Sequence, residues 1–161
     1  FEIETSKAIG IQLLRHRSFS FQEFSQRYQD VNRLGDMFEP IELRAQCEDN
    51  RQSSTEVIDP KLPIIGNEGI LASEAIEGHL ELAHSLYNRL LEAGVAREQA
   101  RMILPLATTT KIHMTGSIRS WIHFLELRDD EHAQKEIQLI AKEIKKHFKE
   151  QFPIISESLK Y

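Results

Sequence analysis

The chain has 161 residues, of which 40% are hydrophobic and 28% charged, and its formal net charge at neutral pH is −5. This size and composition predict one soluble globular domain with a substantial core. The acidic balance argues against a nucleic acid polymer as partner. A membrane protein is disfavoured because no apolar run approaches the roughly 20 residues that a spanning helix needs.

The single cysteine, Cys47, excludes an internal disulfide framework and indicates a reducing, cytoplasmic compartment. Its acidic neighbours disfavour the thiolate that a nucleophile needs, so we expect an incidental thiol at a strand end. The chain opens on Phe1 instead of methionine. We therefore expect a single domain over 1–161 whose N-terminal part is missing from the chain.

In the first half of the chain, alternating apolar and polar residues predict a strand over 1–5. Ser6 is a favourable N-cap for a short helix over 7–15. A second alternating segment, 38–44, predicts an edge strand because it contains a proline. The polar, proline-bearing stretch 47–67 is typical of a long surface loop, and its length would suit a lid.

The second half of the chain is mostly helical in pattern. Apolar spacings of three and four predict an amphipathic helix over 70–93, which Gly94 ends. The remaining predicted elements are a helix over 97–104, a strand over 108–114, a helix over 118–128 capped by Ser117, an amphipathic helix from Asp129 or Asp130 to Phe148, and a short helix after Pro153. Together they predict an α+β fold, mostly helical, with a small antiparallel sheet and two long amphipathic helices.

The most informative segment is 15–28, RHRSFSFQEFSQRY, at the boundary where the first predicted helix ends. It contains three arginines, a histidine, a glutamate and three serines. A basic cluster in an acidic chain indicates a specific anion site. Arginine forks match pairs of phosphate or carboxylate oxygens, and neighbouring hydroxyl and amide groups can complete such a shell.

Three further arginines occupy suggestive positions. Arg101 lies just before a helix-ending proline, and Arg119 lies in a first helical turn, where the helix dipole favours anions. Arg128 closes the same helix. Because nine residues separate Arg119 and Arg128, they point to opposite sides and should serve separate ligands. His123 shares a face with Arg119. Pairing with a surface carboxylate explains any one of these arginines equally well.

Other chemistries have weak support. The seven histidines show no HExxH pattern and no paired spacing with cysteine, so we expect no metal site. Glycine-rich phosphate loops of the GxGxxG and Walker A kinds are absent from the sequence. A Ser-His-Asp triad stays open, although no GxSxG elbow marks a nucleophile. A bound nucleotide would therefore depend on arginine side chains and helix ends.

Three blocks of the sequence match a known signature. The first carries RHRxxSxxExSxRY at 15–28, the second carries ARxxLP at 100–105, and the third covers 118–128 together with 132–137. These blocks resemble those of the flavin-dependent thymidylate synthases, over nearly the whole chain. The resemblance implies the fold of that family and a methyltransferase that converts dUMP to dTMP.

The same resemblance implies FAD as cofactor, with NADPH and 5,10-methylenetetrahydrofolate as co-substrates. It also implies a homotetramer whose active sites are shared between subunits. The residues implied for FAD are Arg15, His16, Arg17, Glu23, Ser117, Ile118, Arg119 and His123. The residues implied for dUMP are Gln12, Leu13, Leu14, Arg15, Glu23, Phe24, Ser25, Gln26, Arg27, Arg101 and Arg128.

Arg128 is the catalytic candidate, because it matches the arginine that polarises the uracil ring. A cation near the ring stabilises the negative charge that methylation at C5 requires. This would replace the cysteine nucleophile of the other thymidylate synthases, for which the chain has no credible residue. Ser25 is favoured as a hydrogen-bonding group over a nucleophile. The alternative function is a non-catalytic dUMP- and flavin-binding module that lacks its N-terminal part.

Overall fold

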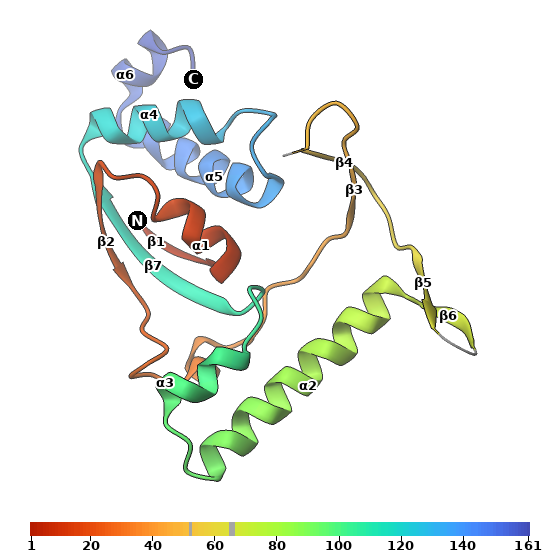
Figure 1. Ribbon diagram of the computed structural model, residues 1–161. Coiled ribbons are helices and arrows are strands. Elements are labelled where there is room, and N and C mark those ends of the chain that lie inside the picture. The colour runs from red at the N-terminus through yellow and green to blue at the C-terminus, as the bar shows by residue number, and fades with distance from the viewer. Residues whose placement is uncertain (52, 65–66) are drawn as a thin grey trace.

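The computed structural model describes residues 1–51, 53–64 and 67–161. Its centre is a three-stranded antiparallel sheet in the order β1–β7–β2 (Figure 1). The strands are β1 (Glu2–Ser6), β2 (Phe19–Glu23) and β7 (Thr109–Gly116). The predicted α+β class with a small antiparallel sheet is confirmed, as are the strands predicted near the N-terminus and at 108–114.

Strand β2 lies within the basic segment 15–28, where only an element boundary was predicted. It pairs with β7 from Phe19 opposite Gly116 to Glu23 opposite Ile112. Arg15–Arg17 therefore precede one end of the strand, and 24–28 follow the other end. The segment is extended because Phe19 and Phe21 alternate with polar residues and cover one side of the sheet.

Helix α1 (Lys7–Leu13) begins as predicted at Ser6, whose hydroxyl accepts from the Ile9 amide at 3.4 Å. It ends at Leu13, earlier than predicted, so the basic triplet lies in the turn that follows. Gly10 lets the helix approach β7 closely, since a Cβ there would lie 3.1 Å from Ile112 Cδ1. Leu13 is fully buried and fixes the helix on the core.

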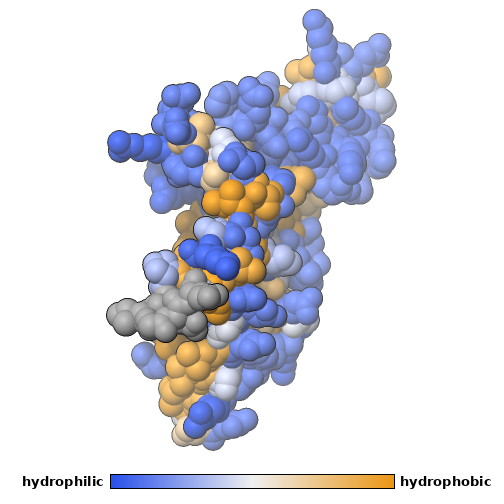
Figure 2. All heavy atoms as spheres, turned by 90° about the vertical axis from the view of Figure 1, so that its right-hand side faces the viewer, coloured by the Kyte–Doolittle hydropathy of each residue, from blue (hydrophilic) through white to orange (hydrophobic). Residues whose placement is uncertain are grey.

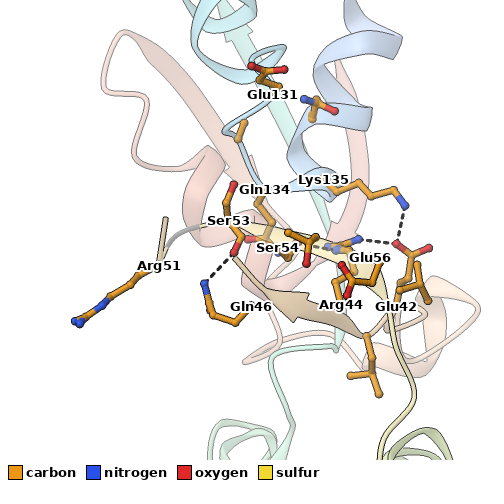
Figure 3. A pocket seen from close by; sticks show the side chains of 15 residues that line it. Glu42, Arg44, Gln46, Arg51, Ser53, Ser54, Glu56, Glu131, Gln134 and Lys135 are labelled. Carbon is orange, nitrogen blue, oxygen red and sulfur yellow. Dashed lines mark hydrogen bonds and ion pairs between the residues drawn. The ribbon is translucent and has the colours of Figure 1, made fainter. Parts of the chain in front are cut away.

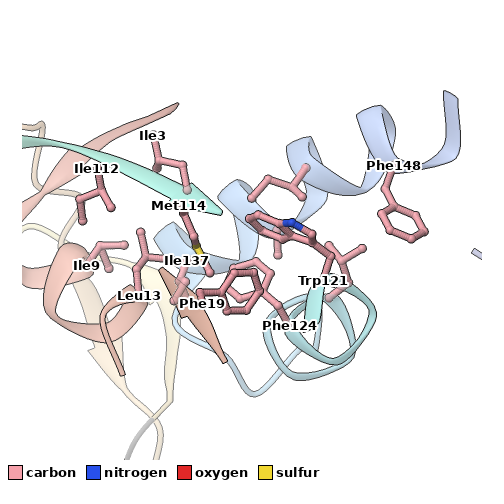
Figure 4. Close-up of a cluster of buried hydrophobic side chains, with 13 residues drawn as sticks. Ile3, Ile9, Leu13, Phe19, Ile112, Met114, Trp121, Phe124, Ile137 and Phe148 are labelled. Carbon is pink, nitrogen blue, oxygen red and sulfur yellow. The ribbon is translucent and has the colours of Figure 1, made fainter. Parts of the chain in front are cut away.

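The main core lies where the sheet and α1 meet three C-terminal helices, α4 (Ile118–Arg128), α5 (Lys135–Gln151) and α6 (Pro153–Ser158). Its members converge from these different elements in Figure 4. Met114, Phe124 and Ile137 are fully buried. This packing fixes α4, with its predicted functional residues, against the sheet edge formed by β2.

A second, smaller core holds helix α2 (Ala72–Glu92) to α3 (Arg97–Ala100) and to two 3₁₀ turns, η1 (Val31–Leu34) and η2 (Arg101–Ile103). Tyr87 is fully buried there. The long amphipathic helix is confirmed, and Gly94, with φ of +83°, follows its end. Most of α2 extends away from the sheet (Figure 1). The helix predicted over 97–104 is divided into α3 and η2.

Two of the predicted elements differ in the structure. Phe38 forms an isolated bridge with Thr108, residues 39–43 lie in no strand, and Arg44 is the first residue of the next strand; Pro40 has no amide donor for a strand. Helix α5 begins at Lys135, several residues later than predicted. The Asp130 carboxylate instead accepts from the His132 amide at 2.8 Å, which holds the preceding residues in a turn.

The predicted loop 47–67 contains parts of two hairpins instead. Strand β3 (Arg44–Gln46) pairs with β4 (Ser54–Val57), and β5 (Lys61–Ile64) pairs with β6 (Asn67–Leu71). Residues 52, 65 and 66 lie outside the described residues. Cys47 directly follows β3, as expected for a thiol at a strand end.

Apolar side chains are exposed on the side of the molecule that carries these hairpins and α2 (Figure 2). Val57 on β4 and Leu82 on α2 are more than half exposed, at 62% and 66%. Within the described ranges, no helix combines the length and apolar character that crossing a bilayer requires.

Replacing Gly116 by alanine should destabilise the fold, because a Cβ there would lie 2.6 Å from Cε1 of the buried Phe19 ring. We expect a loss of about 2 kcal/mol in the free energy of unfolding, measured by denaturant titration. Gly78 is the matched control: a Cβ there meets no atom within 4 Å, and alanine at this helical position should stabilise by about 0.5–1 kcal/mol. A Gly116→Ala protein as stable as wild type would contradict the packing described here.

Candidate functional site

The end of α4 and the turn after α1 meet through Arg128 and His16. Nε of Arg128 donates to Nε2 of His16 at 3.0 Å, across 112 residues of sequence. The His16 ring also packs edge-on against Phe124, with centroids 4.9 Å apart. This contact joins the RHR segment to the predicted catalytic arginine, which sequence spacing alone could not bring together.

His16 is neutral in this arrangement. Its burial and then the nearby Arg128 and His123 lower its pKa to about 4. Because Nε2 accepts from Arg128, the ring proton is assigned to Nδ1. Burial also lowers the pKa of Arg128, which nevertheless stays protonated under all ordinary conditions.

The Arg128 guanidinium is therefore held through its Nε atom, and its two Nη atoms have no hydrogen-bond or ion-pair partner among the described residues. A neutral histidine can orient the guanidinium without cancelling its charge, as a carboxylate would. The arrangement can present two parallel donors and a full positive charge to an anionic or carbonyl group.

The lowered pKa of His16 predicts a pH dependence of stability. The unfolded chain takes up this proton near pH 6.5, while the folded chain does so only near 4, so stability should fall as pH drops through that window. We expect His16 to account for a loss of about 2 kcal/mol in the free energy of unfolding between pH 7 and 5.

Denaturant titrations of wild type and His16→Gln at both pH values measure this effect. The variant should lose less stability on acidification than wild type. Equal pH dependence in wild type and His16→Gln would show that His16 is not held neutral.

A second group of predicted residues lies at the other end of β2. Nη2 of Arg27 lies 3.4 Å from Oε2 of Glu98, and Nε of Arg101 donates to the Glu98 carbonyl at 3.4 Å. The Arg27 guanidinium also lies over the Tyr28 ring, 5.5 Å from its centroid. The Arg27–Glu98 pair is long and half-exposed, so a phosphate could replace this weak carboxylate contact.

Glu23, at the end of β2, is held from both sides. Its Oε1 accepts from Lys7 Nζ at 2.7 Å and from Thr110 Oγ1 at 2.9 Å. Glu23, Leu14 and Gln26 line one cavity of about 280 Å³. The buried Gln26 amide nitrogen has no hydrogen-bond partner within the described part of the chain. This cavity thus combines three of the predicted dUMP residues with an unpaired donor.

Gln12 is linked to the start of α5. Its Nε2 donates to Oε1 of Gln134 at 2.6 Å. Gln134 is the N-cap residue of α5 and was not predicted as a site residue. The signal was available, because Gln134 lies in the 132–137 block on which the resemblance partly rests. Leu13, in contrast, is fully buried, so its side chain cannot contact a ligand in this structure.

Four residues predicted for FAD, Ser117, Ile118, Arg119 and His123, lie in or just before the first half of α4, whereas His16 contacts Arg128 at the end of this helix and Glu23 lies at the far end of β2. Ser117 caps this helix by accepting from the Ser120 amide at 3.2 Å, and Ser120 donates to the Ser18 carbonyl. The exposed Arg119 and His123 lie on one face of the helix. Across the described ranges, the exposed Arg15 and Arg17 side chains form no hydrogen bond or ion pair. An uncompensated group of cations remains.

The two groups of predicted residues do not meet within one chain. His16 precedes β2 in the chain and contacts Arg128 at the end of α4. Arg27 follows the other end of β2 and lies with Arg101 close to α3, whose position Figure 1 shows. The five residues of β2 alone span roughly 17 Å.

A polar cavity of about 590 Å³ lies between the β3–β4 hairpin and the start of α5 (Figure 3). None of the predicted site residues lines it. Arg44 forms ion pairs there with Glu42 and Glu136, and Lys135 pairs with Glu42 at 2.6 Å. These charges compensate one another and join the hairpin to α5, which indicates a structural role.

An oriented guanidinium and further arginines lie around a small antiparallel sheet in this α+β fold, and such a set of donors suits anionic ligands. The family model described as "Thymidylate synthase complementing protein" matches residues 1–154. The flavin-dependent thymidylate synthase of a Synechocystis strain is 42% identical over 99% of this chain and 70% of its own. The flavin-dependent thymidylate synthase of Thermosipho melanesiensis is 37% identical, and the match covers 98% of this chain and 66% of that protein. This chain belongs to the flavin-dependent thymidylate synthase family.

A solved structure agrees with this assignment. The UMP/dUMP methylase PolB from Streptomyces cacaoi, crystallised with 5-Br UMP, superposes with a TM-score of 0.78. It is 26% identical in sequence, and the match covers 99% of this chain and 70% of PolB. The family and the fold expected from the three sequence blocks are both confirmed.

Proposed function

We propose that this chain is an FAD-dependent thymidylate synthase that methylates dUMP to dTMP without a cysteine nucleophile. The methylene carbon would come from 5,10-methylenetetrahydrofolate and the reducing equivalents from NADPH. The observation that carries the proposal is the contact between Arg128 and the neutral His16 ring, which leaves the guanidinium fork free. Family membership supports the reaction class.

Arg128 would act on the uracil ring. Two donors of a held guanidinium can bind a ring carbonyl and stabilise the negative charge that makes C5 nucleophilic. His16 would keep the fork aligned by accepting the hydrogen bond from Arg128 Nε, while its own neutrality leaves the charge of Arg128 undiminished. No covalent attachment to the chain is needed in this step.

The cations around α4 fit FAD, whose pyrophosphate is anionic. Arg15, Arg17 and Arg119 are exposed and form no ion pair with the described residues, the exposed His123 shares a helix face with Arg119, and the start of α4 offers free amide groups. These residues, together with Ser117 and Ile118, would hold FAD. Bound FAD would supply the hydride that completes the methyl group.

The phosphate of dUMP would bind Arg27 and Arg101 from a second copy of the chain. Two observations support shared sites and, with the family resemblance, a homotetramer: the two groups of residues are separated by β2, and α2 exposes apolar side chains. Leu82 and Leu86, one helical turn apart, are 66% and 43% exposed. The single cysteine supports a cytoplasmic location.

The visible spectrum of the purified protein is the first test. A yellow protein with flavin absorbance, bleached by NADPH, is expected, and calorimetry should show dUMP binding. Samples without NADPH are the control for bleaching. A colourless protein that binds neither FAD nor dUMP would refute the proposed function.

A further inference from the structure

Lys7 occupies an unusual position for a lysine. It is the first residue of α1, where the helix dipole disfavours a positive charge. Its side chain is nevertheless only 23% exposed, and its Nζ lies 2.7 Å from Glu23 Oε1. Partial burial of a cation at this end of a helix requires a specific anionic partner, and Glu23 is that partner.

The contact fixes Glu23 in one orientation. Thr110 Oγ1 donates to the same carboxylate oxygen at 2.9 Å, so two donors from α1 and β7 converge on Oε1. Throughout the described residues, no hydrogen bond involves Oε2. Lys7 and Thr110 thus hold one oxygen of Glu23 and leave the other available to a ligand.

A cavity lies beside this carboxylate. Lys7, Glu23 and Gln26 line the same cavity of about 280 Å³. The Gln26 amide nitrogen is buried without a hydrogen-bond partner among the described residues, although Gln26 is only 7% exposed. A buried donor without a partner is costly, and a ligand in the cavity that both residues line could engage the Gln26 amide and the free oxygen of Glu23.

We propose that Lys7 is a positioning residue for dUMP: it orients Glu23 and compensates its charge, so that an anionic nucleotide can bind beside a carboxylate. This inference rests on the proposed function, because it takes Glu23 as a residue that contacts dUMP. Lys7 itself need not touch the nucleotide. Its effect should therefore appear only through Glu23.

The test measures dUMP binding by calorimetry and dUMP KM by steady-state kinetics in Lys7→Met, Glu23→Gln and the double variant. Lys7→Met should raise both the dUMP Kd and KM about tenfold, with a smaller change in kcat and with flavin retained. In a protein that already carries Glu23→Gln, adding Lys7→Met should raise the dUMP Kd and KM little further, because the two residues act as one unit. Lys7→Arg should restore most of the affinity.

Lys111→Met is the matched control. Lys111 on β7 also pairs with glutamates, Glu2 and Glu4 on the neighbouring strand β1. This substitution should leave dUMP binding unchanged. If Lys7→Met lowers thermal stability, the double-variant cycle still decides, because a general folding defect would add to the Glu23→Gln loss. If the losses of dUMP affinity in the two single variants add up in the double variant, or if Lys7→Met binds dUMP as wild type does, the role of Lys7 is refuted while the proposed function stands. Wild-type protein that binds no dUMP overturns the proposed function and this inference together.

Discussion

Replacing Arg128 by alanine is expected to lower kcat for dTMP formation by about 10²–10³-fold while the protein keeps its flavin. The Arg128 guanidinium is oriented by His16, and among the described residues its terminal nitrogens have no partner, so they can stabilise charge on the ring. Its removal also leaves His16 Nε2 without its donor. Steady-state kinetics and the flavin absorbance of the purified variant measure the two effects separately.

Two further variants sharpen this prediction. Arg128→Lys keeps the charge but loses both Nε and the planar fork, so most of the rate should still be lost. Arg33→Ala removes an exposed arginine outside the predicted site and should leave kcat unchanged. Near-normal dTMP formation by Arg128→Ala would refute the role assigned to this residue.

The second large effect concerns the phosphate group. Arg27→Ala should raise the dUMP Kd by about 10–100-fold, because a charge-assisted contact to phosphate is lost. Arg101→Ala should act in the same direction, since both arginines lie against Glu98. The loss should be largest at low ionic strength, where exposed charges are least screened. Calorimetric titration at two salt concentrations measures it.

Deoxyuridine, which lacks the phosphate, is the matched ligand for this experiment. Its affinity should be nearly the same in wild type and Arg27→Ala. If Arg27→Ala instead loses FAD and keeps its affinity for dUMP, Arg27 belongs to the cofactor and the assignment made here is wrong.

Local signals in the sequence predicted much of the fold. Ser6 and Ser117 cap helices because their side chains satisfy free amides in the first turn, and that requirement is visible in sequence alone. The long amphipathic pattern before Gly94 likewise identified α2 to within two residues at its start. These elements depend on interactions within a few residues, so their patterns are reliable.

The hairpins could not be predicted in the same way. Strands β3 and β4 are short, and β4 is exposed along its whole length, so burial leaves no alternating pattern in the sequence. Their pairing depends on backbone hydrogen bonds between segments whose side chains carry little signal. Strand β2 was missed for another reason: Phe19 and Phe21 do alternate with polar residues, but the surrounding arginines and serines marked the segment as a binding cluster.

The site itself was predicted as a set of residues but not as an arrangement. Motif resemblance named His16 and Arg128 for different ligands, and only the packing of α4 against the turn after α1 brings them into contact. Lys7 was not selected at all, because a lone lysine next to a capping serine has no distinctive pattern. Its role appears only when β7 and β2 place Thr110 and Glu23 beside it.

The central claim is thymidylate synthesis without a cysteine nucleophile, and one measurement tests it directly. The rate of dTMP formation from dUMP, methylenetetrahydrofolate and NADPH should be compared for wild type and Cys47→Ser. We expect both proteins to form dTMP at the same rate. Loss of turnover in Cys47→Ser, or a wild-type protein that binds flavin and dUMP yet forms no dTMP, would contradict the account.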